Sequence, residues 1–228
     1  MTIMKEAETL WRKDSGDWSH WRGVGRWSND LAWLTIGKLH YAMIYLMLSQ
    51  YSPWQDYSKL SVLEFGCGGG ANAVELCQHF GCVYGMDISE ATLAECVRQV
   101  NLIDAHNFVP MLMLIDRPGA YFRKMSEQVQ IFLSTAVYYH FPSKEYGIRV
   151  TEFASQILTH PGFAIIQIRY DDGDPMFKPK DKDYAENARL FMSYSSNEFA
   201  TICQDCGFEI LQTSKTKMHS EYFLLRKK

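Results

Sequence analysis

The sequence has no excess of positive charge. Its 228 residues carry 23 Lys and Arg against 26 Asp and Glu, which gives a formal net charge of −3. Nucleic-acid-binding domains usually show a basic patch or stripe. The basic run Arg226, Lys227 and Lys228 is expected to be a solvated tail. The composition therefore argues against a nucleic-acid partner.

The sequence also lacks a hydrophobic run long enough to cross a membrane. Its most apolar helical stretch, residues 39–48, includes His40 and two tyrosines. It is shorter than the roughly 20 apolar residues that a membrane-spanning helix needs. The first ten residues contain Lys5, Glu6 and Glu8 and no apolar run, unlike a secretory signal. We therefore expect a soluble, cytoplasmic protein with no membrane partner.

Cysteine is too scattered to cross-link the chain or to hold a metal. Of the six cysteines, Cys203 and Cys206 form a C-x-x-C pair, and no second Cys or His pair stands at zinc-site spacing. A chain of this length can bury a full core without disulfides. The sequence therefore predicts reduced thiols and no metal centre, and it leaves the oligomeric state open.

Tryptophan, by contrast, is concentrated at one end. Five of the six tryptophans lie in the first 33 residues, and the segment 14–29 mixes them with Gly, Ser, His and Arg. Residues 1–54 are expected to form an aromatic arm followed by a helix over about 30–49. The arm is interpreted either as a lid over a site or as ordinary core packing. In the lid interpretation Trp21, Arg22 and Arg26 contact the substrate, since Arg binds anions through a planar fork.

From residue 55 onward, short apolar strands alternate with helices. The pattern predicts strands over 61–65, 82–86, 108–114, 130–133 and 163–168, helices over 71–80, 89–100, 144–158 and 197–206, and closing strands over 208–213 and 222–225. Such alternation is typical of a parallel sheet with helices on both faces, and the closing pair predicts an antiparallel edge. We expect one α/β core over 55–228, with a doubly wound, mostly parallel sheet. Ligands of such sheets bind beyond the carboxyl ends of the strands.

The first of these strands ends in a glycine-rich turn. Residues 62–70 are V-L-E-F-G-C-G-G-G, in which Glu64 precedes Gly66 and Gly68. Glycine allows a backbone to turn sharply and to approach a ligand closely. Nineteen residues after Gly68 the second strand ends at Asp87, where a carboxylate can accept both hydroxyls of a ribose. The two motifs together predict a pocket for an adenosine-containing ligand.

Two cofactors use this arrangement. A dinucleotide places its pyrophosphate against the helix that follows the glycines, and Ala71 is permitted at the third position of its motif. S-adenosylmethionine has no phosphate and carries an ammonium, a carboxylate and a sulfonium. Glu64 is awkward beside a pyrophosphate and suited to a cationic ligand, so it favours S-adenosylmethionine. The alternatives are an NAD(P)-dependent oxidoreductase, although no Tyr-x-x-x-Lys is recognisable, and a non-catalytic adenosine-ligand-binding module.

The sequence resembles the class I S-adenosylmethionine-dependent methyltransferases. V-L-E-F-G-C-G-G-G is similar to that family's first motif, Y-G-M-D-I-S at 84–89 to its strand-two motif, and I-F-L-S-T-A-V-Y-Y-H-F at 131–141 to its strand-four motif. F-A-I-I-Q-I-R-Y at 163–170 fits the fifth strand. The resemblance covers roughly residues 55–228. It implies a Rossmann-like, seven-stranded sheet with S-adenosyl-L-methionine as the cofactor.

The resemblance also implies roles for individual residues. Glu64, Gly66, Cys67 and Gly68 would line the methionine end of the cofactor, Asp87 would hold the ribose, Ile88 and Asp116 would contact the adenine, and Ser134 would close the pocket from below. Tyr139 departs from the family pattern, because many relatives have the first of two histidines there.

The implied reaction transfers a methyl group to an O or N nucleophile of a small organic molecule, as in natural-product tailoring, or of a peptide terminus. His140 is the candidate general base, since histidine titrates near pH ~6.5, or else it orients the loop before Pro142. A carboxylate acceptor needs no base, because it is ionised at neutral pH. Arg169, like the arginines of the arm, is suited to capture a carboxylate. Tyr138 is the remaining expected acceptor contact.

Overall fold

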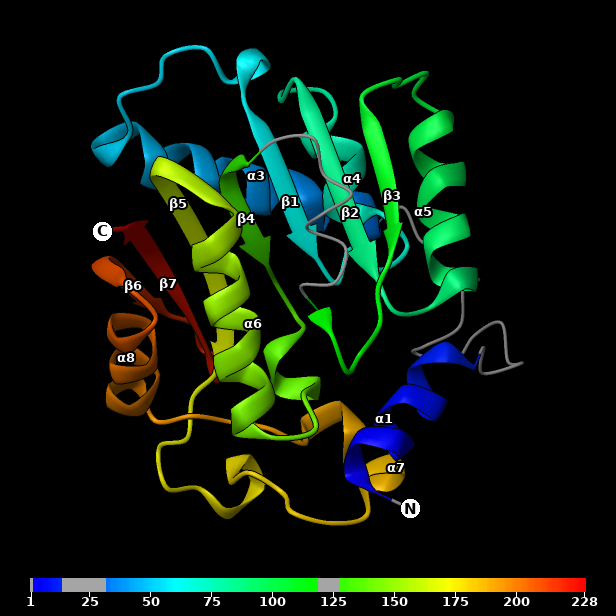
Figure 1. The fold of residues 1–228 in the computed structure, drawn as a ribbon, viewed down its shortest axis with the longest axis vertical. Coiled ribbons are helices and arrows are strands. Elements are labelled where there is room, and N and C mark those ends of the chain that lie inside the picture. The colour runs from blue at the N-terminus through cyan, green and yellow to red at the C-terminus, as the bar shows by residue number, and fades with distance from the viewer. Residues whose placement is uncertain (1, 14–31, 119–127) are drawn as a thin grey trace. The chain divides into compact units, whose positions relative to one another are not determined.

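The computed structural model describes residues 2–13, 32–118 and 128–228. Its seven strands form one sheet in the order β3-β2-β1-β4-β5-β7-β6, with helices on both faces (Figure 1). β7 runs antiparallel to β5 and β6, whereas β1, β2 and β3 are parallel to one another, as are β4 and β5. The predicted doubly wound, mostly parallel α/β fold is confirmed. The chain divides into two compact units, residues 11–113 and residues 1–10 with 114–228.

The unit of residues 11–113 carries the glycine-rich turn. Its elements are α3 (Ala32–Tyr51), β1 (Ser61–Phe65), α4 (Ala71–Leu76), β2 (Cys82–Asp87), α5 (Glu90–Asn101) and β3 (Phe108–Leu112), with a 3-10 turn at Tyr57–Lys59. Nearly all of β1 is buried, as expected for a central parallel strand. α5 begins where the Ser89 hydroxyl accepts a hydrogen bond from the Thr92 amide. α3 packs so closely on α4 that a Cβ at Gly37 would lie 2.0 Å from the Ala71 carbonyl oxygen.

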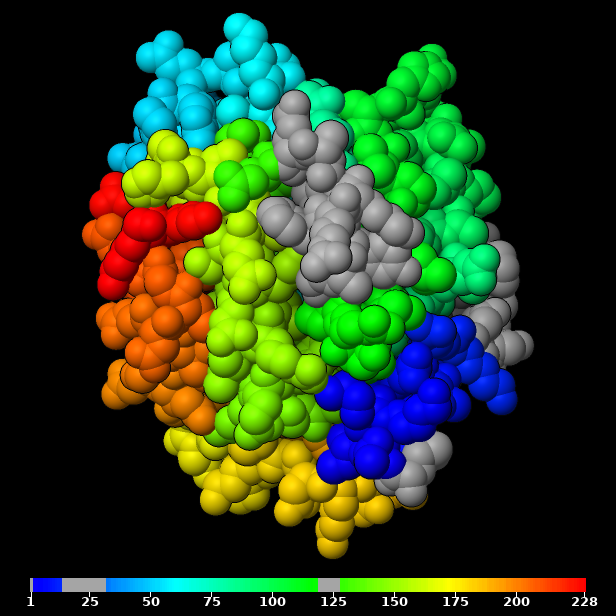
Figure 2. All heavy atoms as spheres, viewed as in Figure 1, coloured from blue at the N-terminus to red at the C-terminus, as the bar shows by residue number. Residues whose placement is uncertain are grey.

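The second unit holds the remaining strands. Its elements are β4 (Val129–Ser134), η3 (Tyr138–His140), α6 (Lys144–Ile157), β5 (Leu158–Arg169), η4 (Pro175–Phe177), α7 (Tyr184–Asn187), η5 (Ala188–Leu190), α8 (Ser196–Asp205), β6 (Phe208–Lys215) and β7 (Ser220–Lys227). α8 begins with a capping box, in which Ser195 and Glu198 each bond the other's backbone amide. α6 and α8 lie side by side on the face seen in Figure 2, in yellow-green and orange.

Most elements lie within a few residues of their predicted bounds. Helix α1 (Ile3–Arg12) was not predicted. β5 begins at Leu158, directly after α6, whereas the prediction began this strand at residue 163. α3 belongs to the same compact unit as β1, β2 and β3, and the division of the chain at residue 54 stays a prediction. Among the described helices, none has both the length and the hydropathy to cross a membrane.

Candidate functional site

The glycine-rich turn is held against the end of β2 by its own backbone. Gly66, Gly68 and Gly70 all have positive φ, of 79°, 54° and 95°, a region that residues with a Cβ rarely enter. The amides of Gly66 and Cys67 both donate to the carbonyl of Met86, at 2.8 and 2.9 Å. The turn therefore requires glycine at the positions that the sequence motif marks.

Asp87 connects this turn to the start of α5. Its Oδ2 accepts a hydrogen bond from the Gly68 amide and its Oδ1 one from the Ser89 amide, each at 2.9 Å. Burial raises the pKa of the Asp87 carboxyl, while these backbone hydrogen bonds act to lower it. A carboxylate oxygen can accept two hydrogen bonds. Asp87 thus has acceptor capacity left for the two hydroxyls of a ribose.

Glu64 is a buried carboxyl beside the same turn. Its side chain is 2% exposed, and Oε1 accepts a hydrogen bond of 2.7 Å from Nδ2 of Asn72. Oε2 has no hydrogen-bond partner within the described residues. Burial raises the pKa of Glu64 to about 8, and the nearby Asp87 adds to this, against the opposing effect of Asn72. A buried oxygen in this state is suited to a cationic ligand group.

His140 is fixed in one orientation at the end of η3. Its Nδ1 lies 2.7 Å from the backbone oxygen of Ala188. A carbonyl oxygen can only accept, so Nδ1 carries the proton and Nε2 is the basic nitrogen of the neutral ring. The backbone oxygen of His140 accepts a hydrogen bond from the Tyr184 hydroxyl. This arrangement supports either of the predicted roles, a general base or a residue that orients the loop.

Arg169 is a buried cation at the carboxyl end of β5. Its side chain is 8% exposed, and its guanidinium carbon lies 4.6 Å from the centre of the Tyr139 ring. Nη2 donates to the backbone oxygen of Arg189 at 3.5 Å, and Nη1 has no partner in the described part of the chain. Burial lowers the pKa of Arg169, with Tyr139 acting in the opposite direction. An arginine stays charged in proteins, so the site is suited to an anion.

The segment that carries the glycine-rich turn and Asp87 matches a known domain family. Residues 62–155 match the methyltransferase domain family. This segment is a methyltransferase domain. The resemblance drawn from the sequence motifs is confirmed, since the matched residues include the glycine-rich turn, Asp87 and the strand-four motif. No curated protein sequence matches the chain.

Solved structures, among them methyltransferases, show the same fold as this chain. Magnesium protoporphyrin IX methyltransferase (ChlM) from Synechocystis PCC 6803 with bound SAM has a TM-score of 0.66 at 16% identity, over 100% of this chain and 98% of that one. TehB from Haemophilus influenzae gives 0.60 at 18% identity, over 82% and 62%. The mitomycin 7-O-methyltransferase MmcR gives 0.56 at 13% identity, over 81% and 54%. At these identities the likeness shows the fold alone.

The other residues assigned to the cofactor differ in their exposure. The Cys67 thiol is buried, and its hydrogen bond with Cys96 together with burial raises its pKa. Ile88 is half-buried directly after β2, and Ser134 is fully buried at the end of β4. Asp116 is exposed, and its carboxylate lies 3.3 Å from Arg117. Their contacts with the cofactor stay predictions.

The position of Tyr138 corrects one expected acceptor contact. Its side chain is fully buried, and its hydroxyl hydrogen-bonds with that of Thr151 at 3.1 Å. Its ring packs against Phe141 and Phe199, with ring centres 4.6 and 5.5 Å away. Tyr138 is therefore a core residue rather than an acceptor-binding one. Trp21, Arg22 and Arg26, the arm residues expected to contact the acceptor, lie outside the described residues.

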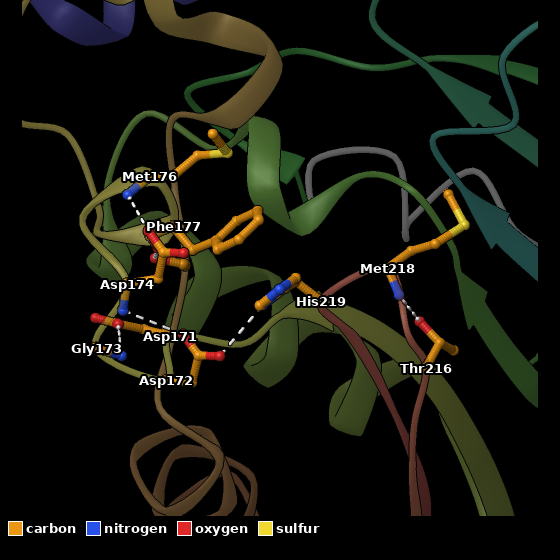
Figure 3. A network of polar contacts seen from close by, with 10 residues as sticks. Asp171, Asp172, Gly173, Asp174, Met176, Phe177, Thr216, Met218 and His219 are labelled. Atoms are coloured by element: carbon orange, nitrogen blue, oxygen red, sulfur yellow. Dashed lines mark hydrogen bonds and ion pairs between the residues drawn. The ribbon is translucent and has the colours of Figure 1, made fainter.

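The polar stretch that follows β5 is anchored to the turn between β6 and β7 (Figure 3). Nδ1 of His219 lies 3.5 Å from Oδ2 of Asp172, and the His219 ring stacks on Phe177 with centres 3.7 Å apart. Aspartate side chains also close the turns inside this stretch, as where Asp174 Oδ1 accepts from the Met176 amide at 2.9 Å. Arg169 therefore lies next to a loop that contacts His219 through Asp172 and Phe177.

Two residues of the site, His40 and Asn72, were missed in the sequence. His40, on α3, places Nδ1 2.8 Å from Oδ1 of Asn72, the residue that also bonds Glu64. The two positions are 32 residues apart and share no motif. Spacing alone could not have revealed the contact.

Proposed function

We propose that this protein binds S-adenosylmethionine and transfers its methyl group to an oxygen or nitrogen nucleophile of a small organic molecule. The observation that carries the proposal is Glu64, whose buried Oε2 has no partner among the described residues and lies beside the glycine-rich turn. The fold adds support, because similar structures carry bound SAM or SAH.

The residues of this chain fit such a cofactor better than a dinucleotide. Glu64 offers an oxygen to a cationic group, and Asp87 has lone pairs left for a ribose. A pyrophosphate at the same turn would add negative charge beside Glu64 and would bring no cation to pair with its ionised form. These two side chains therefore favour S-adenosylmethionine over NAD(P).

The protein's part in the reaction is to hold the two reactants in line and to exclude water. When bound, the cofactor supplies an electrophilic methyl group on a positively charged sulfur. Positioning a nucleophile correctly is worth up to ~7–11 kcal/mol of a reaction barrier. The aromatic arm, residues 14–29, is proposed as a lid that keeps water from the site.

Arg169 points to an acceptor that carries a carboxylate. Its Nη1 is buried and has no partner within the described ranges, and the Tyr139 ring lies against its guanidinium. A carboxylate would supply the missing partner, either as the methylated group itself or as a handle. We therefore propose a small organic acid, an acidic secondary metabolite or a peptide carboxyl terminus as the acceptor.

Calorimetry followed by an acceptor screen tests this function. The protein should bind S-adenosylmethionine and S-adenosylhomocysteine and should not bind NAD. Labelled S-adenosylmethionine should then transfer its methyl group to members of a carboxylate library, and amide analogues of the same compounds should react poorly. Binding of NAD without binding of either sulfur ligand would reverse the cofactor assignment. Cofactor binding with no transfer to any compound class would favour a non-catalytic binding module.

A further inference from the structure

Three side chains from three elements form a hydrogen-bonded chain that ends at Glu64. His40 comes from α3, Asn72 from the first turn of α4, and Glu64 from β1. Nδ1 of His40 lies 2.8 Å from Oδ1 of Asn72, and Nδ2 of Asn72 lies 2.7 Å from Oε1 of Glu64. Asn72 and Glu64 are buried, with 6% and 2% of their surface exposed. The chain therefore links a helix outside the glycine-rich turn to the carboxyl beside that turn.

The direction of these hydrogen bonds is fixed by the chemistry of the amide. Asn72 donates to Glu64 through Nδ2, so its Oδ1 is the atom that faces His40. Oδ1 can only accept, and therefore His40 donates through a protonated Nδ1. Burial lowers the pKa of His40, so the ring is neutral at pH 7. His40 therefore orients Asn72, and Asn72 donates to Oε1 of Glu64. Oε2 is left as the oxygen of Glu64 that can carry a proton.

Within the described residues, the groups that act on the Glu64 carboxyl bring no positive charge. The side chain of Asp87, at the end of β2, disfavours a second ionised carboxyl. Glu64 also interacts with the thiols of Cys67 and Cys77. The pKa of Cys67 is raised mainly by its hydrogen bond with Cys96 and by burial, and the pKa of Cys77 mainly by burial. With a neutral His40 on α3 and a neutral amide on α4, the ionised form of Glu64 has no cation near it within the described residues. Burial of that form is costly until a cation arrives.

We propose that Glu64 carries a proton on Oε2 in the cofactor-free protein and releases it when the cationic end of S-adenosylmethionine binds, with His40 and Asn72 as positioning residues that hold Oε1. The inference rests on the proposed function. In this step the O–H bond of the carboxyl breaks, its electron pair stays on Oε2, and the proton passes to the buffer. Glu64 is neutral in the cofactor-free protein. In the complex its carboxylate is paired with the cationic end of the cofactor, so neither state buries an uncompensated charge.

Proton release can be counted by titrating S-adenosylmethionine at pH 7 in two buffers of different ionisation enthalpy. A pKa of about 8 for Glu64 leaves about nine-tenths of the groups protonated at that pH, so close to one proton should appear per cofactor bound. The matched control ligand is 5′-methylthioadenosine, which keeps the adenosine and lacks both the ammonium and the sulfonium. It should release none. Release of a full proton by this control would place the source at Asp87 and overturn the inference.

The affinity for the cofactor should also depend on pH, in the direction that proton release requires. Because the proton must leave, the cofactor Kd should weaken about tenfold from pH 7 to pH 6, whereas Glu64→Gln should bind weakly with a Kd independent of pH over that range. The α-amino group of the ligand titrates near pH ~8, so wild-type protein and Glu64→Gln are compared at each pH. Without cofactor at pH 9, Glu64→Gln should melt at a higher temperature than the wild-type protein, because a buried ionised carboxyl is removed.

The positioning role of His40 is tested with two substitutions. His40→Gln keeps an N–H that can reach Asn72 and should retain the wild-type pH profile, whereas His40→Leu should raise the cofactor Kd by about tenfold and change the proton count. Equal behaviour of the two variants would show that His40 does not position Asn72 and Glu64. Cofactor binding by wild-type protein with no proton release would overturn the inference alone. No cofactor binding at any pH would overturn the proposed function, and the inference with it.

Discussion

Replacing Arg169 with methionine should weaken acceptor binding and stabilise the protein at the same time. The guanidinium is buried, its Nη1 has no partner within the described residues, and the hydrogen bond from Nη2 to the backbone oxygen of Arg189 is long at 3.5 Å. Methionine fills the space of the aliphatic stem and carries no charge. The substitution therefore removes an incompletely compensated cation from the interior without leaving a large cavity.

The two effects have different sizes. Loss of charge-assisted hydrogen bonds to a carboxylate should cost about 1.5–3 kcal/mol, which corresponds to an acceptor KM raised about 10- to 150-fold. Removal of a poorly paired buried charge should increase the free energy of unfolding by about 1 kcal/mol. The cation–π contact with Tyr139, at 4.6 Å, offsets part of that gain by about 0.5–1 kcal/mol.

The assays are acceptor kinetics and urea unfolding, with Arg149→Met as the matched control. Arg149 also lies over a tyrosine ring, 5.3 Å from the centre of Tyr146, and also donates to a backbone oxygen, but it is exposed. The control should leave acceptor KM unchanged. If Arg169→Met unfolds at lower urea concentration and keeps the wild-type KM, Arg169 is a structural residue and the carboxylate assignment is wrong.

Four further outcomes are expected. Asp87→Ala should raise the cofactor Kd about 10- to 150-fold by calorimetry, and an unchanged Kd in a folded variant would make Asp87 structural. His140→Ala should reduce kcat about tenfold or less, well below the ~10²–10⁴ of a general base, so a thousandfold loss would identify it as that base. Gly85→Ala should lower the free energy of unfolding by about 1–3 kcal/mol, because its Cβ would lie 2.5 Å from the Phe108 ring; an unchanged urea midpoint would contradict this. Deletion of residues 14–29, which lie outside the described ranges, should lower kcat and spare cofactor Kd, and full activity would exclude a lid.

The order of strands and helices could be predicted because hydrophobic periodicity and glycine are local signals. The stretch from Ser61 to Asp87 contains an apolar strand, a glycine turn, a helix and a second strand, and each is identifiable from its own residues. α1 was missed because its polar sequence gives little apolar contrast in only ten residues. The early start of β5 was missed because Pro161 argues against a strand.

The candidate site could be predicted only where it coincides with a motif. Glu64 and Asp87 lie in the last two residues of β1 and β2, at the carboxyl ends of the strands, where ligands of such sheets bind. Nothing in the sequence separates Tyr138, which is buried in the core, from its neighbour Tyr139, which lies against Arg169. The link from His40 to Asn72 depends on how α3 packs on α4, and that packing is a long-range property of the fold.

The contact at Gly37 has a practical consequence for exchanging segments between homologous proteins. The backbone of α3 meets the Ala71 carbonyl with no space for a methyl group, and α3 also supplies His40. A donor α3 with any larger residue at this position would push on the first turn of α4 and displace Asn72. Chimaeras that import a foreign amino-terminal segment should therefore be joined before Ala32, with the native α3 retained, and not in the linker after Tyr51.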